Sequence, residues 1–247
     1  PTRAYPRSMR AIRVTQLVGE GTNDVELVDV ESAAPADGEI AILVEYSSLN
    51  YKDALALTGR AGIIRAPQLI AGIDVVGVVH ESRDARWTPG DRVIVTGRGL
   101  GETRDGGLAT RVIVPADLAV RIPDAFTARQ AAAIGTAGFT AALCVEELAA
   151  ASGGSLADTE AVVSGAGGGV GSIGVRLLHA AGARVTAISG RPALADALLE
   201  LGADAVLARS RLADGGLAHT WNDGRAAVPA FVEYYSALGG ACLSFYE

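Results

Sequence analysis

The stretch Val163-Ser-Gly-Ala-Gly-Gly-Gly-Val-Gly171 decides the fold, because it stands between a predicted strand and a predicted helix. Gly165, Gly168 and Gly171 lie three residues apart. Small residues at that spacing allow a tight turn, a close approach of backbone N–H groups to a pyrophosphate, and close packing of helix on strand. The helix N-terminus would face the negative charge. In this setting the pattern predicts a dinucleotide site, and the alternative is a glycine-rich turn without a ligand.

The glycine stretch belongs to a longer pattern of alternating strands and helices. The residues expected to bind the dinucleotide are Gly165, Gly168, Gly169, Val170 and Gly171. Strands are expected at residues 161–164, 184–188 and 205–207, and helices at residues 170–181 and 192–201. Continuous apolar strands with intervening helices indicate a parallel sheet that is covered on both faces.

The end of the second of these strands favours NADPH over NADH. An NAD site normally carries Asp or Glu there, to bind the ribose 2′-hydroxyl, whereas residues 188–192 read Ile-Ser-Gly-Arg-Pro. Ser189 and Arg191 can instead bond a 2′-phosphate, which a planar guanidinium grips well. The alternative is that Arg191 is a solvated surface charge.

Short β-rich runs fill the chain before Pro123. Strands are expected at residues 11–17, 25–30, 39–46, 73–81, 92–96 and 106–115, with a helical turn at 54–58. Closely spaced strands separated by turn residues suggest a small β-barrel. After Pro123, we expect Thr127 to cap an Ala-rich helix that runs through Ala133, and a second helix at residues 138–150.

The composition of the 247 residues is that of a globular protein, with 49% hydrophobic and 20% charged residues. The net charge of −7 and the lack of a basic stripe argue against a nucleic-acid binder. The longest apolar runs are too short to span a bilayer, so no membrane partner is expected. Two cysteines, Cys144 and Cys242, make no disulfide framework. With no signal peptide expected, the cytoplasm is the expected compartment.

Several motifs together resemble one enzyme family, the zinc-free branch of the medium-chain dehydrogenase/reductase superfamily. Within that branch the sequence looks most like the acrylyl-CoA reductases, close to the quinone oxidoreductases. The motifs follow one another from about Met9 to Arg209 in family order and spacing. They are EYSSLNYKD (45–53), GIDVVG (72–77), PGDRVIV (89–95), GTAGFTA (135–141), the glycine stretch, SGRP (189–192) and LGAD (201–204).

The resemblance implies an α/β protein with two domains. A GroES-like β-barrel catalytic domain is expected at residues 9–125, and a Rossmann-type doubly wound parallel sheet that binds NADPH at 126–247. The active site is expected in the cleft between them. Because Met9 is the only methionine, residues 1–8 are expected to be an extension or a remnant of cloning.

A zinc ion is not expected in this protein. Zinc alcohol dehydrogenases supply a Cys, a Gly-His-Glu and a later Cys. In this sequence the first ligand position reads Asn50, and the Gly-His-Glu position reads Gly72-Ile-Asp74. The three histidines are scattered at positions 80, 179 and 219, without the spacing of metal ligands.

The run Asn50-Tyr-Lys-Asp53 is the candidate catalytic cluster, and it contains Lys52, the only lysine of the chain. Reduction of an enoyl thioester needs donors for the charge that develops on the thioester oxygen and an acid for the α-carbon. Tyr51 and Lys52 are the candidates, and the sequence does not rank them. Asp53 could orient or neutralise Lys52, and Asn50 could bond the substrate or the nicotinamide ribose. The alternative is a polar turn with an ordinary Lys–Asp pair.

Five further residues are candidates for the site. By family position Thr136 and Thr140 line the cofactor cleft, with helix capping and packing as the alternative. An acyl-CoA substrate needs basic residues at the cleft mouth, and Arg60 and Arg65 are the candidates. Asp74 lies in an apolar run, so its carboxylate must find a partner. It is a candidate substrate residue, or else a carboxylate that caps local backbone amides.

The family is usually longer than this chain, and the match fades after Arg209. Residues 210–247 do not supply the expected second half of the Rossmann sheet, which would leave an exposed edge and uncovered apolar faces. Three explanations stay open. The tail is a condensed replacement with a return strand at 241–246, a partner subunit covers the edge, or the chain is a truncated or altered product that binds poorly or not at all.

Three functional hypotheses follow from these residues and the resemblance. The first is an NADPH-dependent reductase for the C=C bond of a 2-enoyl thioester of the acryloyl-CoA type. The second is an NADPH:quinone reductase, which would need a flat apolar slot. The third, motivated by the short C-terminus, is a non-catalytic NADPH-binding protein. Members of the family are commonly dimers, so the resemblance also allows a homodimer.

Overall fold

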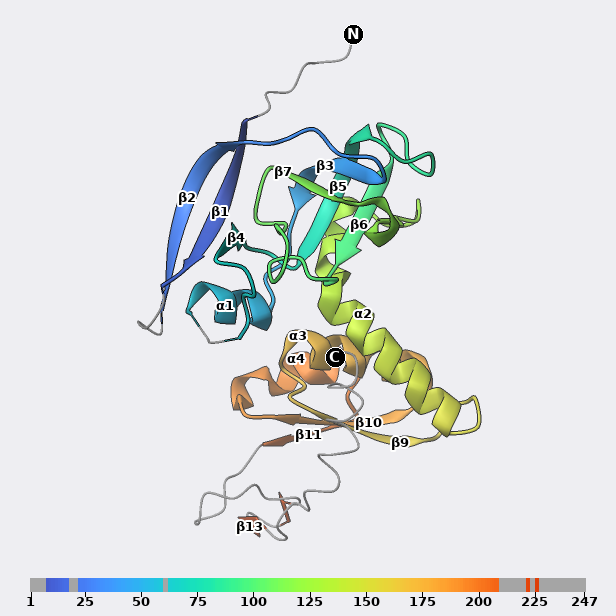
Figure 1. Ribbon diagram of the computed structural model, residues 1–247. Helices are drawn as coiled ribbons and strands as arrows, with labels where there is room; N and C mark the ends of the chain where they lie inside the picture. The colour runs from blue at the N-terminus through green and yellow to red at the C-terminus, as the bar shows by residue number, and fades with distance from the viewer. Residues whose placement is uncertain (1–7, 18–21, 60–61, 209–220, 223–224, 227–247) are drawn as a thin grey trace. The chain divides into compact units, whose positions relative to one another are not determined.

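The computed structural model describes residues 8–17, 22–59, 62–208, 221–222 and 225–226. The chain divides into two compact units, Pro1–Thr136 and Ala137–Glu247 (Figure 1). This division falls inside helix α2 (Ala128–Ala151). The domain boundary expected at residues 125/126 stays a prediction. Arg60 and the suggested return strand at 241–246 lie outside the described residues.

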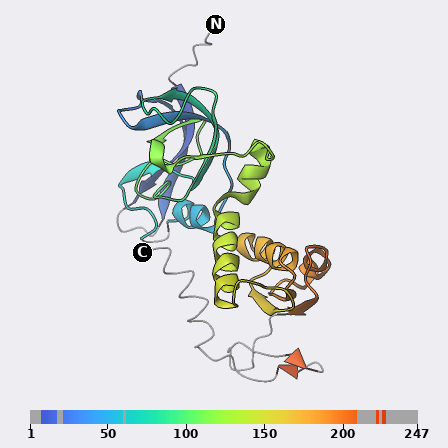
Figure 2. The ribbon, with the colours of Figure 1, turned by 90° about the vertical axis from the view of Figure 1, so that its right-hand side faces the viewer.

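The first unit is built from antiparallel strands, which curve around one another in Figure 2. One sheet has the order β2-β1-β4, from β1 (Ser8–Gln16), β2 (Asn23–Glu31) and β4 (Gln68–Ile70). The other has the order β7-β3-β5-β6-β8, from β3 (Glu39–Tyr46), β5 (Asp74–Ser82), β6 (Arg92–Thr96), β7 (Arg111–Pro115) and β8 (Val120–Arg121). Helix α1 (Tyr51–Leu57) follows β3, and η1 (Ala116–Leu118) follows β7.

Side chains at every second position build the core of this unit. Within a strand, residues two apart lie on the same face of the sheet. The pairs Ile40 and Ile42, Val93 and Val95, and Val112 and Val114 are all buried in one cluster. The alternating pattern of the sequence therefore places this face inside, as a half-buried antiparallel sheet requires.

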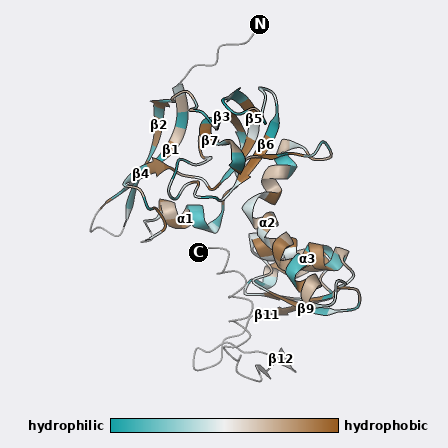
Figure 3. Cartoon of the chain, turned by 45° about the vertical axis from the view of Figure 1, so that its right-hand side comes forward, coloured by the Kyte–Doolittle hydropathy of each residue, from teal (hydrophilic) through white to brown (hydrophobic). Residues whose placement is uncertain are grey.

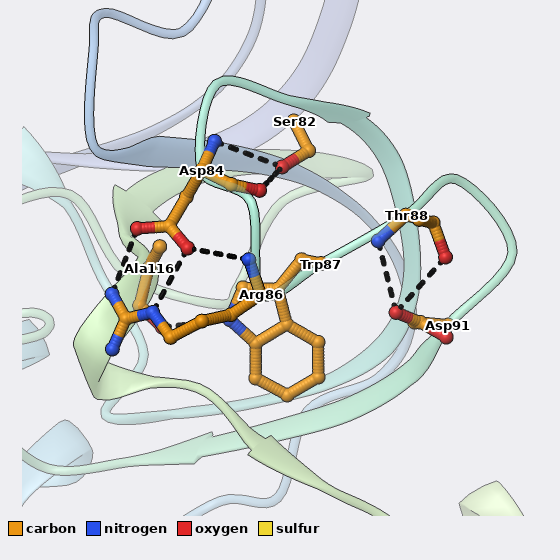
Figure 4. Close-up of polar contacts among 7 residues, drawn as sticks. All are labelled: Ser82, Asp84, Arg86, Trp87, Thr88, Asp91 and Ala116. Carbon is orange, nitrogen blue, oxygen red and sulfur yellow. Dashed lines mark hydrogen bonds and ion pairs between the residues drawn. The ribbon is translucent and has the colours of Figure 1, made fainter.

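A polar turn closes one side of this core around Trp87 (Figure 4). The indole Nε1–H of Trp87 donates to the Ala116 carbonyl oxygen at 2.9 Å, so the buried polar atom is satisfied. Hydrogen bonds from Arg86 and Arg121 lower the pKa values of Asp84 and Asp91, respectively, to about 2. The turn is held by the internal Arg86–Asp84 pair and by the pair of Asp91 with Arg121 of β8, and it contains none of the candidate site residues.

The expected strand at residues 106–115 is shorter than predicted, because β7 begins at Arg111. Gly106 and Gly107 instead pack backbone to backbone against the segment that precedes β5. A Cβ at Gly106 would lie 2.0 Å from the Gly72 carbonyl oxygen, and one at Gly107 would lie 1.9 Å from that of Asp74. These two glycines allow two backbone segments to pack closely, and they do not belong to a paired strand.

The second unit contains a parallel sheet of order β11-β10-β9. Its elements are β9 (Glu160–Ser164), α3 (Gly169–Ala180), β10 (Arg184–Ser189), η2 (Pro192–Leu194), α4 (Ala195–Glu200) and β11 (Ala205–Ala208). Strands β12 (Trp221–Asn222) and β13 (Arg225–Ala226) pair with each other. The parallel order confirms the βαβ pattern that the sequence predicted.

One face of this sheet carries the core of the second unit. Val175 and Leu178 of α3 pack with Val185 and Ala187 of β10, and Figure 3 shows hydrophobic residues along much of α3 and β11. On the opposite face Val162 is 57% exposed. The described residues form the core on one face of the sheet, and the expectation that both faces are covered stays a prediction.

Helix α2 begins with the predicted cap and is interrupted in its middle. The Gln130 backbone N–H donates to the Thr127 hydroxyl at 3.2 Å, and the Thr127 N–H donates to the Gln130 side chain at 2.9 Å. Gly135 has φ 46° and ψ −156°, which separates two helical segments. The 24 residues are long and apolar enough to cross a bilayer by length and composition alone. Nevertheless, Ala131 and Ala132 pack into the core of the first unit.

Candidate functional site

The glycine loop lies between β9 and α3, where the sequence predicted it. Gly165 has φ +66°, a conformation that favours glycine, and its carbonyl accepts the Gly168 N–H at 2.8 Å. A Cβ at Gly171 would lie 2.4 Å from the Gly165 carbonyl oxygen and 2.8 Å from the Ala166 Cα. The first turn of α3 therefore touches the loop backbone, and only hydrogen fits between them.

The N-terminus of α3 suits an anion. Gly168 is the residue before its first turn and supplies no side chain to cap the backbone N–H groups. Helix α3 has 12 residues, which is enough for its dipole to make the N-terminus partly positive. Gly169 and Val170 lie in its first turn and are exposed. This end of the helix can donate backbone N–H groups to a phosphate.

The end of β10 brings Ser189 and Arg191 to the glycine loop. The Arg191 guanidinium donates to the Gly167 carbonyl oxygen. The Ser189 side chain is buried and its hydroxyl accepts the Arg191 backbone N–H at 3.1 Å. Ser189 thus fixes the turn, and the exposed Arg191 side chain extends over the loop. A cationic group at the rim of an anion cradle is suited to a second phosphate.

In the first unit, Asp74 is the centre of a buried hydrogen-bond cluster. Its side chain is 0% exposed at the start of β5. Its Oδ2 accepts the Ser48 hydroxyl at 2.6 Å and the Asn50 amide Nδ2 at 2.9 Å. Thr136 donates its backbone N–H to Oδ2 at 3.0 Å and its hydroxyl to Oδ1 at 2.5 Å. These donors satisfy a carboxylate whose burial would otherwise be costly.

Asn50 and Asp53 begin helix α1. Together they form a capping box, in which the Asn50 backbone N–H donates to Asp53 Oδ2 at 2.7 Å. The other oxygen of Asp53 accepts the Ile73 N–H at 2.9 Å. Burial raises the pKa of the Asp53 carboxyl, those two backbone bonds lower it, and the charge of Asp74 adds to the rise. Asp53 therefore joins α1 to the segment before β5.

Lys52 forms an ion pair with Glu102, a residue that the sequence analysis did not single out. Both Asp53 oxygens accept backbone N–H groups, and the expectation that Asp53 orients or neutralises Lys52 stays a prediction. Arg65 reaches the other oxygen of Glu102 at 3.2 Å. Glu102 is half-buried, with 14% of its side chain exposed, so one carboxylate draws the predicted catalytic lysine and the predicted substrate arginine together. Tyr51, which directly precedes Lys52 in the sequence, is 80% exposed.

The predicted residues therefore fall into three groups. Asn50, Asp74 and Thr136 meet in one cluster, Lys52 and Arg65 meet at Glu102, and the glycine loop meets Ser189 and Arg191. Thr140 lies on α2 in the second unit and is half-buried. Among the described residues, no three His, Cys, Asp or Glu side chains gather as a metal site would require.

Sequence reasoning missed Ser48, Glu102 and Gly135. Ser48 and Gly135 lie inside motifs that were recognised, but nothing in their spacing showed that they meet at Asp74. A Cβ at Gly135 would lie 2.6 Å from Asp74 Oδ2 and 2.7 Å from the Ser48 hydroxyl. Glu102 is 50 residues from Lys52, and no local signal links the two.

Comparison with known proteins supports the family that the motifs suggested. Residues 36–124 match the alcohol dehydrogenase GroES-like domain. A probable acrylyl-CoA reductase of Escherichia coli, AcuI, is 47% identical over 83% of this chain and 63% of its own length. A putative quinone oxidoreductase of Bacillus subtilis, YhfP, is 44% identical over 74% of this chain and 55% of its own.

A solved structure supports the same family. The yhdH oxidoreductase of Salmonella enterica, crystallised in complex with NADP, is 43% identical with a TM-score of 0.75. The match covers 82% of this chain and 63% of that protein. The chain thus spans less than two thirds of the length of these relatives. The expected GroES-like and Rossmann-type fold class is confirmed.

Proposed function

We propose that this chain is an NADPH-dependent reductase. The premise is that it belongs to the medium-chain dehydrogenase/reductase superfamily, among the acrylyl-CoA reductases and quinone oxidoreductases. Its substrate would be the C=C bond of a 2-enoyl thioester of the acryloyl-CoA type. The observation that carries the proposal is the glycine loop with Arg191 across it. The cytoplasm is the compartment that we propose.

The residues of the second unit fit NADPH. The loop from Gly165 to Gly171 has the close backbone approach that a pyrophosphate needs, and a Cβ at Gly171 would disrupt it. The N-terminus of α3 adds backbone donors. Arg191 would hold the 2′-phosphate, and Ser189 would keep the turn in place. No acidic side chain directly follows β10 in the sequence to select a 2′-hydroxyl instead.

The chemistry of the reduction divides between cofactor and chain. When bound, NADPH supplies the hydride that adds to the β-carbon. The Lys52 ammonium, anchored by Glu102, is a donor for the thioester oxygen or for the α-carbon proton. The Tyr51 phenol is the other candidate, and it is exposed. Arg65 would face the phosphates of an acyl-CoA.

The same residues support a reaction without zinc. At the position where zinc dehydrogenases carry their first ligand, Asn50 donates its amide to Asp74. At the Gly-His-Glu position, the backbone N–H of Ile73 donates to Asp53. Charge stabilisation would therefore come from hydrogen-bond donors and the lysine, and not from a Lewis acid.

A quinone substrate is the second candidate, and two observations favour keeping it. One of the relatives is named a putative quinone oxidoreductase. In this chain Leu49 and Tyr51, on either side of Asn50, are 76% and 80% exposed. The Leu49 side chain, beside the candidate catalytic cluster, and the Tyr51 ring, within it, could pack on a flat ring. A non-catalytic NADPH-binding protein is the third candidate.

The test is to follow the oxidation of NADPH by purified protein at the nicotinamide absorbance, with acryloyl-CoA, crotonyl-CoA or a quinone. We expect oxidation that depends on the enoyl thioester. Oxidation with the quinone alone would favour the second candidate. Binding of NADPH without oxidation would favour the third, and lack of binding would refute the proposal. The mass of the same sample in solution tests the expected homodimer.

The cofactor preference has its own test. Arg191→Ala should weaken NADPH binding about tenfold or more and leave NADH binding nearly unchanged, because only NADPH carries the 2′-phosphate. Arg184→Ala is the matched control, since Arg184 lies at the other end of β10 in an exposed pair with Glu160. Equal losses for both cofactors would show that Arg191 does not read the 2′-phosphate.

A further inference from the structure

The Asp74 side chain is fully buried, yet the three residues whose side chains donate hydrogen bonds to it come from the segments expected to form the active site. Ser48 and Asn50 lie between β3 and α1, and Thr136 follows the break in α2. We propose that Asp74 is a positioning residue, which sets the hydroxyl polarity of Thr136 and Ser48 and the orientation of the Asn50 amide. The inference rests on the proposed function, because Asn50 and Thr136 are among the residues proposed for its site.

The polarity follows from the chemistry of the carboxylate. An ionised carboxylate accepts hydrogen bonds and donates none. The Thr136 hydroxyl must therefore direct its proton to Asp74 Oδ1, and the Ser48 hydroxyl must direct its proton to Oδ2. Toward any further partner both hydroxyls offer lone pairs. A ligand group that donates a hydrogen bond matches that polarity.

The backbone enforces this arrangement. Gly135 has φ 46°, a conformation that residues with a side chain rarely adopt, and a Cβ there would lie 2.6 Å from Asp74 Oδ2. The break at Gly135 turns the Thr136 N–H toward the carboxylate, which accepts it at 3.0 Å. The glycine thus lets the second segment of α2 begin against Asp74. No rotation of one side chain could restore the contact if the carboxylate were lost.

Asp74→Asn would reverse the hydrogen-bond direction of the Thr136 hydroxyl at nearly constant side-chain volume. The Asn50 Nδ2–H donates to Oδ2, and the Thr136 N–H lies nearer to Oδ2, at 3.0 Å, than to Oδ1, at 3.2 Å. Neither group can become an acceptor. The new amide must therefore keep its oxygen on that side and place its NH₂ where Oδ1 was. The Thr136 hydroxyl would then accept from that NH₂ and present its own proton outward. A ligand group that donates a hydrogen bond would then meet another donor.

The kinetic experiment is a double-mutant cycle with Asp74→Asn, Thr136→Val and the double variant, assayed with NADPH and crotonyl-CoA. We expect each single variant to lower kcat about tenfold or more, and the double variant to be no slower than Thr136→Val. Asp84→Asn, in the turn of Figure 4, is the control for loss of one carboxylate. Additive losses, or an Asp74→Asn enzyme with wild-type kcat, would overturn the proposal.

A second measurement does not depend on activity. The exchange of the Thr136 amide hydrogen, followed by NMR, should be slow in the wild type, slow in Asp74→Asn and fast in Asp74→Leu, which has no acceptor. Unchanged exchange in Asp74→Leu would refute the positioning role even if the enzyme is active. If the wild type turns over neither enoyl thioester nor quinone, the proposed function fails, and the exchange result alone decides whether Asp74 positions Thr136.

Discussion

Replacement of Gly171 by alanine tests whether the glycine loop works by close approach. Gly171 lies in the first turn of α3, and its Cα faces the backbone at Gly165 and Ala166. Around Gly174, three residues further along the same helix, the described residues outside the helix's own backbone leave the position of a Cβ clear to 4 Å. The two substitutions add the same methyl group to the same helix in opposite surroundings.

The geometry gives the size of the effect. A Cβ at Gly171 would lie 2.4 Å from the Gly165 oxygen, where a relaxed contact needs about 3.5 Å, so helix and loop must separate by about 1 Å. Ala166 is fully buried and cannot yield easily. Overpacking of this kind costs about 1–3 kcal/mol, against a gain of about 1 kcal/mol from helix propensity. Gly174→Ala keeps the gain of about 1 kcal/mol alone.

The assay combines urea unfolding with titration of NADPH by nicotinamide fluorescence. We expect Gly174→Ala to be more stable than wild type and to bind NADPH normally. Gly171→Ala should be less stable than Gly174→Ala by about 1–3 kcal/mol. It should also bind NADPH about tenfold or more weakly, because the loop N–H groups shift by about 1 Å. Wild-type affinity in Gly171→Ala would refute the reasoning that the phosphate lies on this loop.

Two further predictions concern the first unit. Glu102→Gln should lower kcat with the enoyl thioester about tenfold, because the Lys52 ammonium loses its ion-pair partner. The control is Glu26→Gln, in an exposed pair, which should leave kcat unchanged. Equal kcat values for the two variants would remove Glu102 from the site. The pKa of Asp91 is about 2 in the folded protein against an ordinary value of 3.8, so its stabilisation is present above about pH 4 and is lost as the pH falls toward 2. The Tm difference between wild type and Asp91→Asn should therefore shrink between about pH 4 and about pH 2, and a constant difference would contradict the assignment.

The sequence predicted most of the strands because their signal is local. Strands β3 and β6 have the bounds that alternation indicated, Glu39–Tyr46 and Arg92–Thr96. Strands β4 and β8 were not predicted, since three and two residues are too few to show a period. The predicted strand at 106–115 was too long, because Gly106 and Gly107 are held by contacts with residues far earlier in the chain.

The candidate site divides in the same way. The glycine loop and Arg191 were accessible to sequence reasoning, because their geometry depends on one strand, one turn and one helix. The Lys52–Glu102 pair joins residues 50 apart, and the Asp74–Thr136 bonds join residues 62 apart. Only the fold of the first unit brings them together. The role of Asp53 was within reach, since Asn50 and Asp53 have the spacing of a capping box.

The two buried carboxylates of the first unit, Asp53 and Asp74, differ in the kind of hydrogen-bond donor that they accept. The Asp53 oxygens accept backbone N–H groups, which can only donate and have no freedom to turn. Asp74 holds one backbone N–H together with two hydroxyls and an amide, and the carboxylate itself directs the protons of those side chains. Neutralising Asp53 would weaken these backbone bonds without reversing the polarity of either N–H group. Neutralising Asp74 would pass a change of polarity to Thr136. That difference favours the proposed positioning role of Asp74, while a catalytic role of Asp53 stays a prediction.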